Sequence, residues 1–422
     1  MSRNKFWVLL MVFALIGSLA TCGFAAGKTK IVFMNSKGEV TAQLEEAARI
    51  FSKENPGIQV EIVVAPVGQS PFERLSALYG SGNAPALSML DGGDVPKFKD
   101  KYLDLSKEKW VKDSLPGMLT DCTYSGKVIT FPFCAEGYGF IYNKAVLDKA
   151  DVDPGAIKTT SDLKAAFEKV KASGVDPLII GAMDWNLGNH FLAIAYADQS
   201  NKAADVAKFI NSLKVGKANL AGNKVFNGLM STFDVMMAYN AAKNDPLSVA
   251  YEKGAELLGQ GKVGFWFMGT WAWGNIKSFD TANGAYGFIP VPISDNAADY
   301  GNSGIVAGIT KFVGIDKSQN NKAQQAAAKK FLNWLVYSKS GQDAITNKMA
   351  LVAPFKNALE PGDPLGKSMV KYMNAGKTVQ FMSVLPADHW SKTGASMQKY
   401  LAGKLDKAGL AKEIEEYWKT VK

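Results

Sequence analysis

Histidine, cysteine and arginine are scarce in this chain, and each scarcity excludes a class of function. The sequence holds two histidines, three cysteines and three arginines. Zinc sites need three or four ligands, mostly histidine or cysteine, so we predict no metal and no cofactor. Proteins that read nucleic-acid sequence use clustered arginine, so we expect no nucleic-acid partner. The histidines and cysteines are His190, His389, Cys22, Cys122 and Cys134.

The composition is that of a globular protein. Of the 422 residues, 47% are hydrophobic and 21% are charged, which excludes a disordered chain. The length allows two or three domains. The net charge of +9 comes almost entirely from lysines scattered among acidic residues, so we interpret it as a solvated surface.

The first segment is typical of an export signal. Arg3 and Lys5 precede an apolar run over 6–20 that is too short to span a bilayer, and small residues follow it. We therefore predict a signal peptide over 1–26 and an exported, periplasmic protein. Cys22 follows Leu-Ala-Thr, which resembles a lipoprotein box, so the alternative is a lipid at Cys22 that anchors the chain at the cell surface.

Strand and helix patterns alternate along the rest of the chain. A buried strand is predicted over 30–34, a helix over 40–51 from its apolar spacing, and an alternating strand over 58–64. Further strands are expected at 86–90 and 263–268. This order predicts an α/β protein with mainly parallel sheets flanked by helices. Without a linker, the chain should cross between two lobes in several short passes.

The two later cysteines flank a predicted hairpin. Its turn is Ser125-Gly126, which places Cys122 opposite Ile129 rather than Cys134. Because this register keeps the thiols apart, we predict that Cys122 and Cys134 are not bonded.

Polar and aromatic residues follow the predicted strands. Ligands of open α/β sheets bind beyond the carboxyl ends of the strands, where carboxylates and amides bind hydroxyl groups and indole rings cover the C–H face of a sugar. This pattern favours a polyhydroxylated ligand. Two further tryptophans and one histidine lie in polar segments that favour a binding surface. The candidates are Asn35, Ser36, Glu39, Gln69, Asp91, Trp185, His190, Trp271, Trp273 and Trp390.

Two other functions remain open from these residues. Paired carboxylates among Asp91, Glu136 and Asp184 would suit a secreted glycan-acting enzyme. Carboxylates beside tryptophans would also suit a receptor for a polyamine or another small cation, since cations sit over indole faces.

The chain resembles the extracellular solute-binding proteins of family 1, the carbohydrate receptors of bacterial ABC importers that include the maltodextrin-binding proteins. The resemblance covers essentially the whole mature chain. It is carried by Ser36-Lys37-Gly38-Glu39, by 51–60, by 126–132, by Glu136-Gly137-Tyr138-Gly139-Phe140-Ile141-Tyr142-Asn143-Lys144, by Gly269-Thr270-Trp271-Ala272, and by Phe331-Leu332-Asn333-Trp334-Leu335.

The resemblance implies a two-lobed, periplasmic-binding-protein-like fold with the ligand in the cleft. It implies a monomeric receptor without enzymatic activity that delivers a neutral mono- or oligosaccharide to an ABC permease. The implied lobes are 28–138 plus 307–350 and 139–306 plus 351–422. Trp271 is the implied stacking platform, and the implied or predicted polar contacts are Ser36, Glu39, Asp91, Glu136 and Tyr138.

Overall fold

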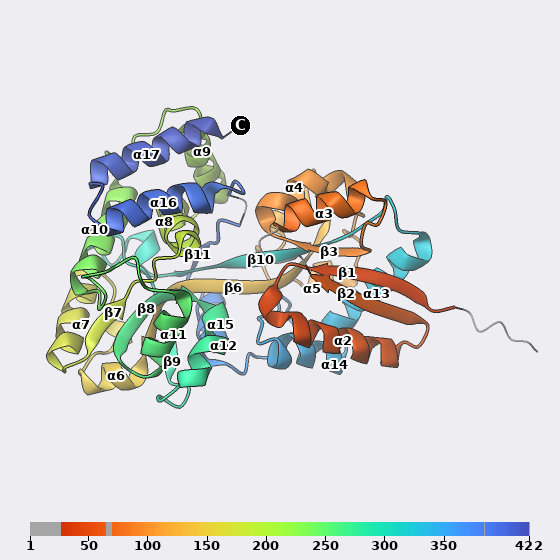
Figure 1. Cartoon of the computed structure of the whole chain (residues 1–422), viewed down its shortest axis with the longest axis horizontal. Coiled ribbons are helices and arrows are strands. Elements are labelled where there is room, and N and C mark those ends of the chain that lie inside the picture. Colours follow the sequence, from red (N-terminus) through yellow and green to blue (C-terminus); the bar gives the residue numbers. More distant parts are fainter. Residues whose placement is uncertain (1–26, 65–69, 384, 422) are drawn as a thin grey trace, which may run out of the picture.

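The computed structural model describes residues 27–64, 70–383 and 385–421, which form two lobes joined by long strands (Figure 1). The predicted signal peptide, Cys22 and Gln69 lie outside these residues. None of the helices that the structure describes is long and apolar enough to span a membrane.

The N-terminal lobe opens with the predicted strand–helix–strand unit. Strand β1 (Thr29–Asn35) pairs in parallel with β2 (Ile58–Val64) over its full length, and β3 (Leu87–Leu90) lies on its other side. Helix α2 (Thr41–Glu54) buries Leu44, Ala47, Ala48 and Phe51, the apolar stripe that its spacing predicted. The helix ends before Pro56-Gly57, which cannot continue it.

One sheet runs through both lobes. Its strand order is β2-β1-β3-β10-β6-β8-β7, with β11 beside β10 and β9 beside β6. Strands pair in parallel within the lobes, whereas the crossing strands β6 and β10 run antiparallel to each other and to β3, β8 and β9. The alternation of strands and helices confirms the α/β class. The remaining strands are β6 (Thr130–Asn143), β7 (Asp176–Ile179), β8 (Val263–Gly269), β9 (Tyr286–Ile289), β10 (Ile305–Ile315) and β11 (Thr378–Gln380).

A bulge interrupts the pairing of the two crossing strands. Ile309 pairs with Ala135 and Lys311 pairs with Cys134, which leaves Thr310 as an extra residue. Side chains normally alternate between the faces of a strand, and an inserted residue breaks that alternation. Both Thr310 and Lys311 consequently face the cavity between the lobes that is described below.

Helices cover the sheet in both lobes (Figure 1). In the N-terminal lobe these are α2, α3 (Pro71–Gly80), α4 (Val95–Phe98), α5 (Lys109–Asp113), α13 (Lys322–Tyr337) and α14 (Lys339–Asp343). In the C-terminal lobe they are α6 (Lys144–Lys149), α7 (Thr160–Ala172), α8 (Leu192–Ala197), α9 (Ala203–Lys214), α10 (Lys224–Tyr239), α11 (Tyr251–Gly259), α12 (Trp273–Ile276), α15 (Pro364–Asn374), α16 (His389–Leu401) and α17 (Lys407–Thr420). Short π-helices cover Trp185–Phe191 (η6) and Ala344–Lys348 (η10).

The predicted hairpin is present as β4 (Thr123–Tyr124) and β5 (Lys127–Val128). The amide of Ile129 donates to the carbonyl of Cys122, so the register is the predicted one. Cys122 and Cys134 are both buried and unbonded, and burial raises the pKa of each thiol to about 12.

Candidate functional site

A cavity of about 410 Å³, here called the first chamber, lies where the carboxyl ends of β1 and β3 face the C-terminal lobe. Residues of both lobes and of the crossing strands line it, so its shape depends on how the lobes are placed. Its lining is Lys37, Glu39, Asp91, Gly92, Glu136, Trp185, Asn189, His190, Trp271, Thr310, Lys311, Phe381 and Ser383.

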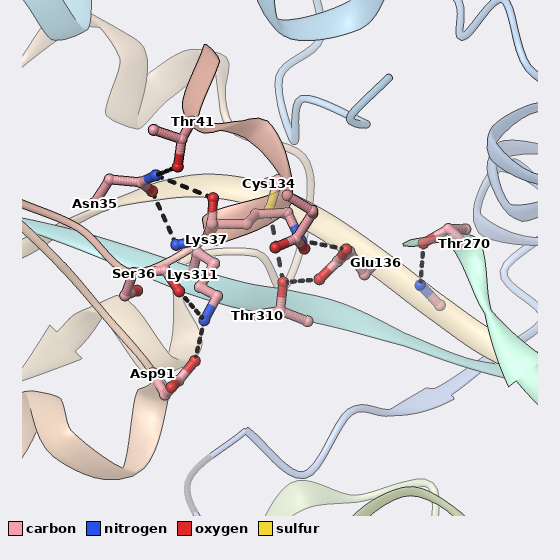
Figure 2. A network of polar contacts seen from close by, with 12 residues as sticks. Asn35, Ser36, Lys37, Thr41, Asp91, Cys134, Glu136, Thr270, Thr310 and Lys311 are labelled. Carbon is pink, nitrogen blue, oxygen red and sulfur yellow. Dashed lines mark hydrogen bonds and ion pairs between the residues drawn. The ribbon is translucent and has the colours of Figure 1, made fainter. Parts of the chain in front are cut away.

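Lys37 is the centre of the polar network on the chamber floor (Figure 2). Its ammonium lies 2.8 Å from Glu136 Oε1 and 2.8 Å from Glu39 Oε1, although its side chain is only 3% exposed. Thr310 donates its hydroxyl to the other oxygen of Glu136. Burial alone would lower the pKa of Lys37, but the two carboxylates, Glu136 foremost, outweigh burial and raise it. Lys37 therefore stays charged and neutralises the buried Glu136.

The loop that presents Lys37 is held together by Asn35. The amide of Asn35 donates to the carbonyl of Lys37 at 3.0 Å and to the hydroxyl of Thr41 at 2.9 Å, and its oxygen accepts from the Lys37 amide at 2.9 Å. The side chain is buried and fully engaged within the protein. Asn35 therefore stabilises the loop, whereas the sequence predicted that it contacts the ligand.

Lys311 connects the crossing strand to the N-terminal lobe. Its ammonium lies 2.6 Å from Asp91 Oδ1 and donates to the carbonyl of Ser36 at 3.4 Å (Figure 2). Ser36 thus contributes its backbone, and its side chain does not line the first chamber. Asp91 is half exposed, which leaves carboxylate surface open to the cavity.

Aromatic rings form the opposite wall. The ring of Trp271 lies 4.9 Å from His190, 6.4 Å from Trp185 and 6.5 Å from Tyr138, centre to centre. Trp271 is only partly buried. Its indole folds back over Gly269, where an added Cβ would lie 2.2 Å from the ring. Glycine at this position therefore allows the tryptophan to lie against the end of β8 and face the chamber.

Tyr138 and His190 lie against the same wall. Tyr138 is buried and is not part of the chamber lining, so it supports the wall from behind rather than facing the cavity as predicted. His190 lines the chamber, and its enclosed Nδ1 has no hydrogen-bond partner among the described residues. Burial lowers the pKa of His190 to about 3, so the ring is neutral at physiological pH.

Two other predicted tryptophans lie outside the first chamber. Trp390 is 41% exposed at the start of α16 and does not line the first chamber. Trp273 lines an adjoining cavity instead. No cluster of three or more histidine, cysteine or acidic residues suited to a metal ion occurs in the described part of the chain.

Sequence reasoning missed several lining residues. Lys37 lies two residues before the predicted Glu39, and its place after a strand end was a usable signal. Lys311 and Thr310 both face the chamber because of the bulge in β10. No local sequence pattern predicts this bulge. The other missed residues are Gly92, Asn189, Phe381 and Ser383.

Known proteins with similar sequences are binding proteins. An uncharacterised ABC transporter extracellular-binding protein of Pyrococcus horikoshii is 25% identical over 417 residues, which is 91% of this chain and 88% of the relative. A probable sugar-binding periplasmic protein of Mesorhizobium japonicum is 26% identical over 231 residues, which is 50% of this chain and 55% of the relative.

Solved structures share the fold. RafE in complex with raffinose superposes with a TM-score of 0.75 at 19% identity, covering 93% of this chain and 99% of that chain. A chitin oligosaccharide binding protein gives a TM-score of 0.73 at 19% identity, covering 93% and 98%. These likenesses confirm the two-lobed solute-binding fold predicted from the sequence.

The sequence profile of the bacterial extracellular solute-binding proteins matches residues 36–342. This match covers well over half of the 422 residues. The chain therefore belongs to the bacterial extracellular solute-binding protein family, and it is a substrate-binding receptor rather than an enzyme.

Proposed function

We propose that this receptor binds a neutral mono- or oligosaccharide in the first chamber and delivers it to the permease of an ABC importer. The observation that carries the proposal is the pairing of an aromatic wall at Trp271 with a polar floor in which two ammonium groups, Lys37 and Lys311, lie against three carboxylates, Glu39, Asp91 and Glu136. A sugar ring has an apolar C–H face for the indole and hydroxyl groups for the floor.

The polar floor suits hydroxyl groups better than charged ones. Glu39 and Asp91 are each partly exposed and can accept hydrogen bonds, while Lys37 and Lys311 hold them in place and can donate. A polyamine would have to compete with these two ammonium groups for the same carboxylates. The lysines therefore favour a neutral ligand. They disfavour the cationic ligand, such as a polyamine, that the sequence left open as an alternative.

The names of similar proteins agree with this choice. The relative of Mesorhizobium japonicum is named as sugar-binding, and the structural neighbours are described with raffinose and chitin oligosaccharides. We further propose that the chain acts as a monomer after export and removal of residues 1–26. Mass spectrometry of the natural N-terminus would distinguish a free periplasmic form from one that carries a lipid on Cys22.

Calorimetric titration tests the ligand class. The purified protein would be titrated with neutral mono-, di- and trisaccharides and, separately, with polyamines. We expect saturable binding of at least one sugar and none of the polyamines. The variant Trp390→Ala, altered at an exposed site away from the chamber, should bind as the parent does. Binding of polyamines without binding of any sugar would overturn the proposal.

A further inference from the structure

The chain contains two Asn-Gly pairs, Asn227-Gly228 and Asn283-Gly284. In this dipeptide the backbone reacts readily with the asparagine side chain, because glycine has no side chain that shields its amide nitrogen. The reaction requires a backbone that can bend until this nitrogen reaches the carbonyl carbon of the asparagine side chain. The structure places the two pairs in opposite surroundings.

Asn227-Gly228 lies inside helix α10. Gly228 is the fifth residue of this helix, so its amide is engaged in a helical hydrogen bond. The side chain of Asn227 donates to the carbonyl of Ala221 at 2.8 Å, and a Cβ at Gly228 would lie 1.8 Å from the carbonyl oxygen of Ile293. Helix and packing together keep the amide of this pair away from the asparagine side chain.

Asn283-Gly284 forms the turn before β9, and the side chain of Asn283 is exposed. Both residues lie in the left-handed region, with φ angles of 51° and 75°. Glycine adopts this region freely and asparagine adopts it at low cost. A Cβ at Gly284 would meet nothing within 4 Å. The turn is therefore open to solvent and has room to change its conformation.

The carboxylate of Asp280 holds this turn closed. Its Oδ2 accepts from the Gly284 amide at 2.7 Å, and its Oδ1 accepts from the Ala282 amide at 2.7 Å and from the Tyr286 hydroxyl at 3.0 Å. Hydrogen bonds to an ionised group are the stronger ones. The Gly284 amide must lose its proton before its nitrogen can attack Asn283, and a hydrogen bond to a carboxylate opposes that loss.

We propose that Asn283 is a site of spontaneous deamidation and that Asp280 sets the rate of this reaction. When the turn opens, the Gly284 amide loses its proton to hydroxide, and its nitrogen forms a bond to Cγ of Asn283. The bond from Cγ to the side-chain nitrogen breaks, and ammonia leaves with a proton from water. Water then opens the five-membered imide ring at either carbonyl carbon, which yields aspartate or isoaspartate.

The modification changes the turn in two ways. Aspartate at 283 places a second negative charge near Asp280, and like charges repel. Isoaspartate also lengthens the backbone by one carbon atom shortly before β9, where Tyr286 pairs with Asn143 of the crossing strand β6. Either product should weaken the hydrogen bonds that Asp280 makes, so we expect the modified chain to melt at a lower temperature than the parent.

Peptide mapping by mass spectrometry tests the inference. The purified chain would be kept in mildly alkaline buffer, and aspartate and isoaspartate would be quantified over time at both Asn-Gly pairs. In the folded protein we expect modification at Asn283 and none at Asn227. In urea, where only the local sequence matters, both should react at similar rates. A folded protein that stays unmodified at Asn283, or that is modified equally fast at Asn227, would overturn the proposed site.

The variant Asp280→Ala tests the role of the carboxylate. It should speed the modification of Asn283 by about tenfold or more, the rate equivalent of losing one hydrogen bond to a charged group. Asp153→Ala is the matched control, because Asp153 accepts from the Gly155 amide at 2.8 Å in another exposed turn. This control should leave the rate at Asn283 unchanged. An equal rate at Asn283 in the two variants would refute the role of Asp280.

A second variant keeps the test decisive if Asp280→Ala folds poorly. Tyr286→Phe removes one of the three hydrogen bonds to Asp280 and keeps the aromatic ring. It should raise the rate at Asn283 by less than Asp280→Ala does, with Asn227 still intact. A rate at Asn283 that neither variant raises would show that Asp280 has no part in the reaction.

Discussion

Trp271 is held by the end of a strand rather than by the hydrophobic core, and this placement has a measurable consequence. Replacing it with alanine should weaken sugar binding by about 1–3 kcal/mol, the range for losing one aromatic stacking partner. Because Trp271 is only partly buried, the unfolding free energy should change little. Loss of a fully buried tryptophan would instead cost roughly 3–5 kcal/mol. Titration and a melting curve of Trp271→Ala check both halves. Unchanged affinity with a large loss of stability would make Trp271 a core residue.

The buried ion pair of Lys37 and Glu136 should matter to stability as well as to binding. Lys37→Met leaves Glu136 without its cation in a buried position, so we expect a loss of about 3–5 kcal/mol in the free energy of unfolding. The double variant Lys37→Met, Glu136→Gln removes both charges and should recover most of that loss. Urea unfolding of the parent, of Lys37→Met and of the double variant measures these free energies of unfolding. A double variant no more stable than Lys37→Met would contradict the stabilising role of the ion pair.

Asp198 makes the stability depend on pH. It follows α8, is 5% exposed, and neither carboxylate oxygen has a partner among the described residues. Burial raises the pKa of Asp198 from its ordinary value of 3.8 to about 8. The folded state therefore keeps a proton that the unfolded chain releases, and stability falls as pH rises from about 4 to about 8.

The variant Asp198→Asn removes this titration. It should be more stable than the parent at pH 8, by up to about 5 kcal/mol because each unit of pKa shift is worth about 1.4 kcal/mol. The difference between the two proteins should shrink towards pH 4. Melting curves of both proteins at several pH values measure it, and a difference that does not vary with pH would show that Asp198 does not titrate as described.

At the scale of elements, the turn after β3 meets the segment after β11 at very short range. A Cβ added at Gly92 would lie 2.5 Å from the carbonyl oxygen of Ser383, and one at Gly93 would lie 2.6 Å from that of Leu385. Beside this contact, the hydroxyl of Ser383 donates to Asp121 of the N-terminal lobe. The two glycines thus allow the lobes to touch.

The variant Gly93→Ala should push these segments apart. The overpacking should cost the contact between the two segments about 1–3 kcal/mol, so we expect sugar binding to weaken. Gly80→Ala is the matched control, since a Cβ there meets nothing within 4 Å. If Gly93→Ala binds sugar as well as Gly80→Ala does, the contact has no part in ligand binding.

Local elements were predictable from the sequence, whereas their long-range partners were not. The periodicity of 40–51 predicted helix α2 and its buried face, because burial of one helix face imposes a spacing on neighbouring residues. The partner of Lys37 is 99 residues away in the chain, and Asp91 and Lys311 are 220 apart. Such pairs depend on strand order and on the bulge at Thr310, which leave no periodic trace in the sequence.

For the whole molecule, we propose that the two lobes move as bodies about the crossing strands. We propose hinges near 138–139, 306–307 and 350–351, where the chain is expected to pass between lobes. A ligand that touches both lobes binds the closed form more tightly and so shifts the population towards it. Small-angle scattering should show a smaller radius of gyration at saturating sugar, and a value that stays constant would count against hinge closure.

The buried cysteines offer a practical use. Thiol reagents attack the thiolate, and burial keeps both Cys122 and Cys134 protonated and out of reach. A recombinant chain that begins at Gly27 contains no other cysteine. Lys277 is exposed at the adjoining cavity that Trp273 lines. A single Lys277→Cys exchange would then carry a fluorescent dye at one defined position, and the receptor would become an optical sensor that reports its own sugar.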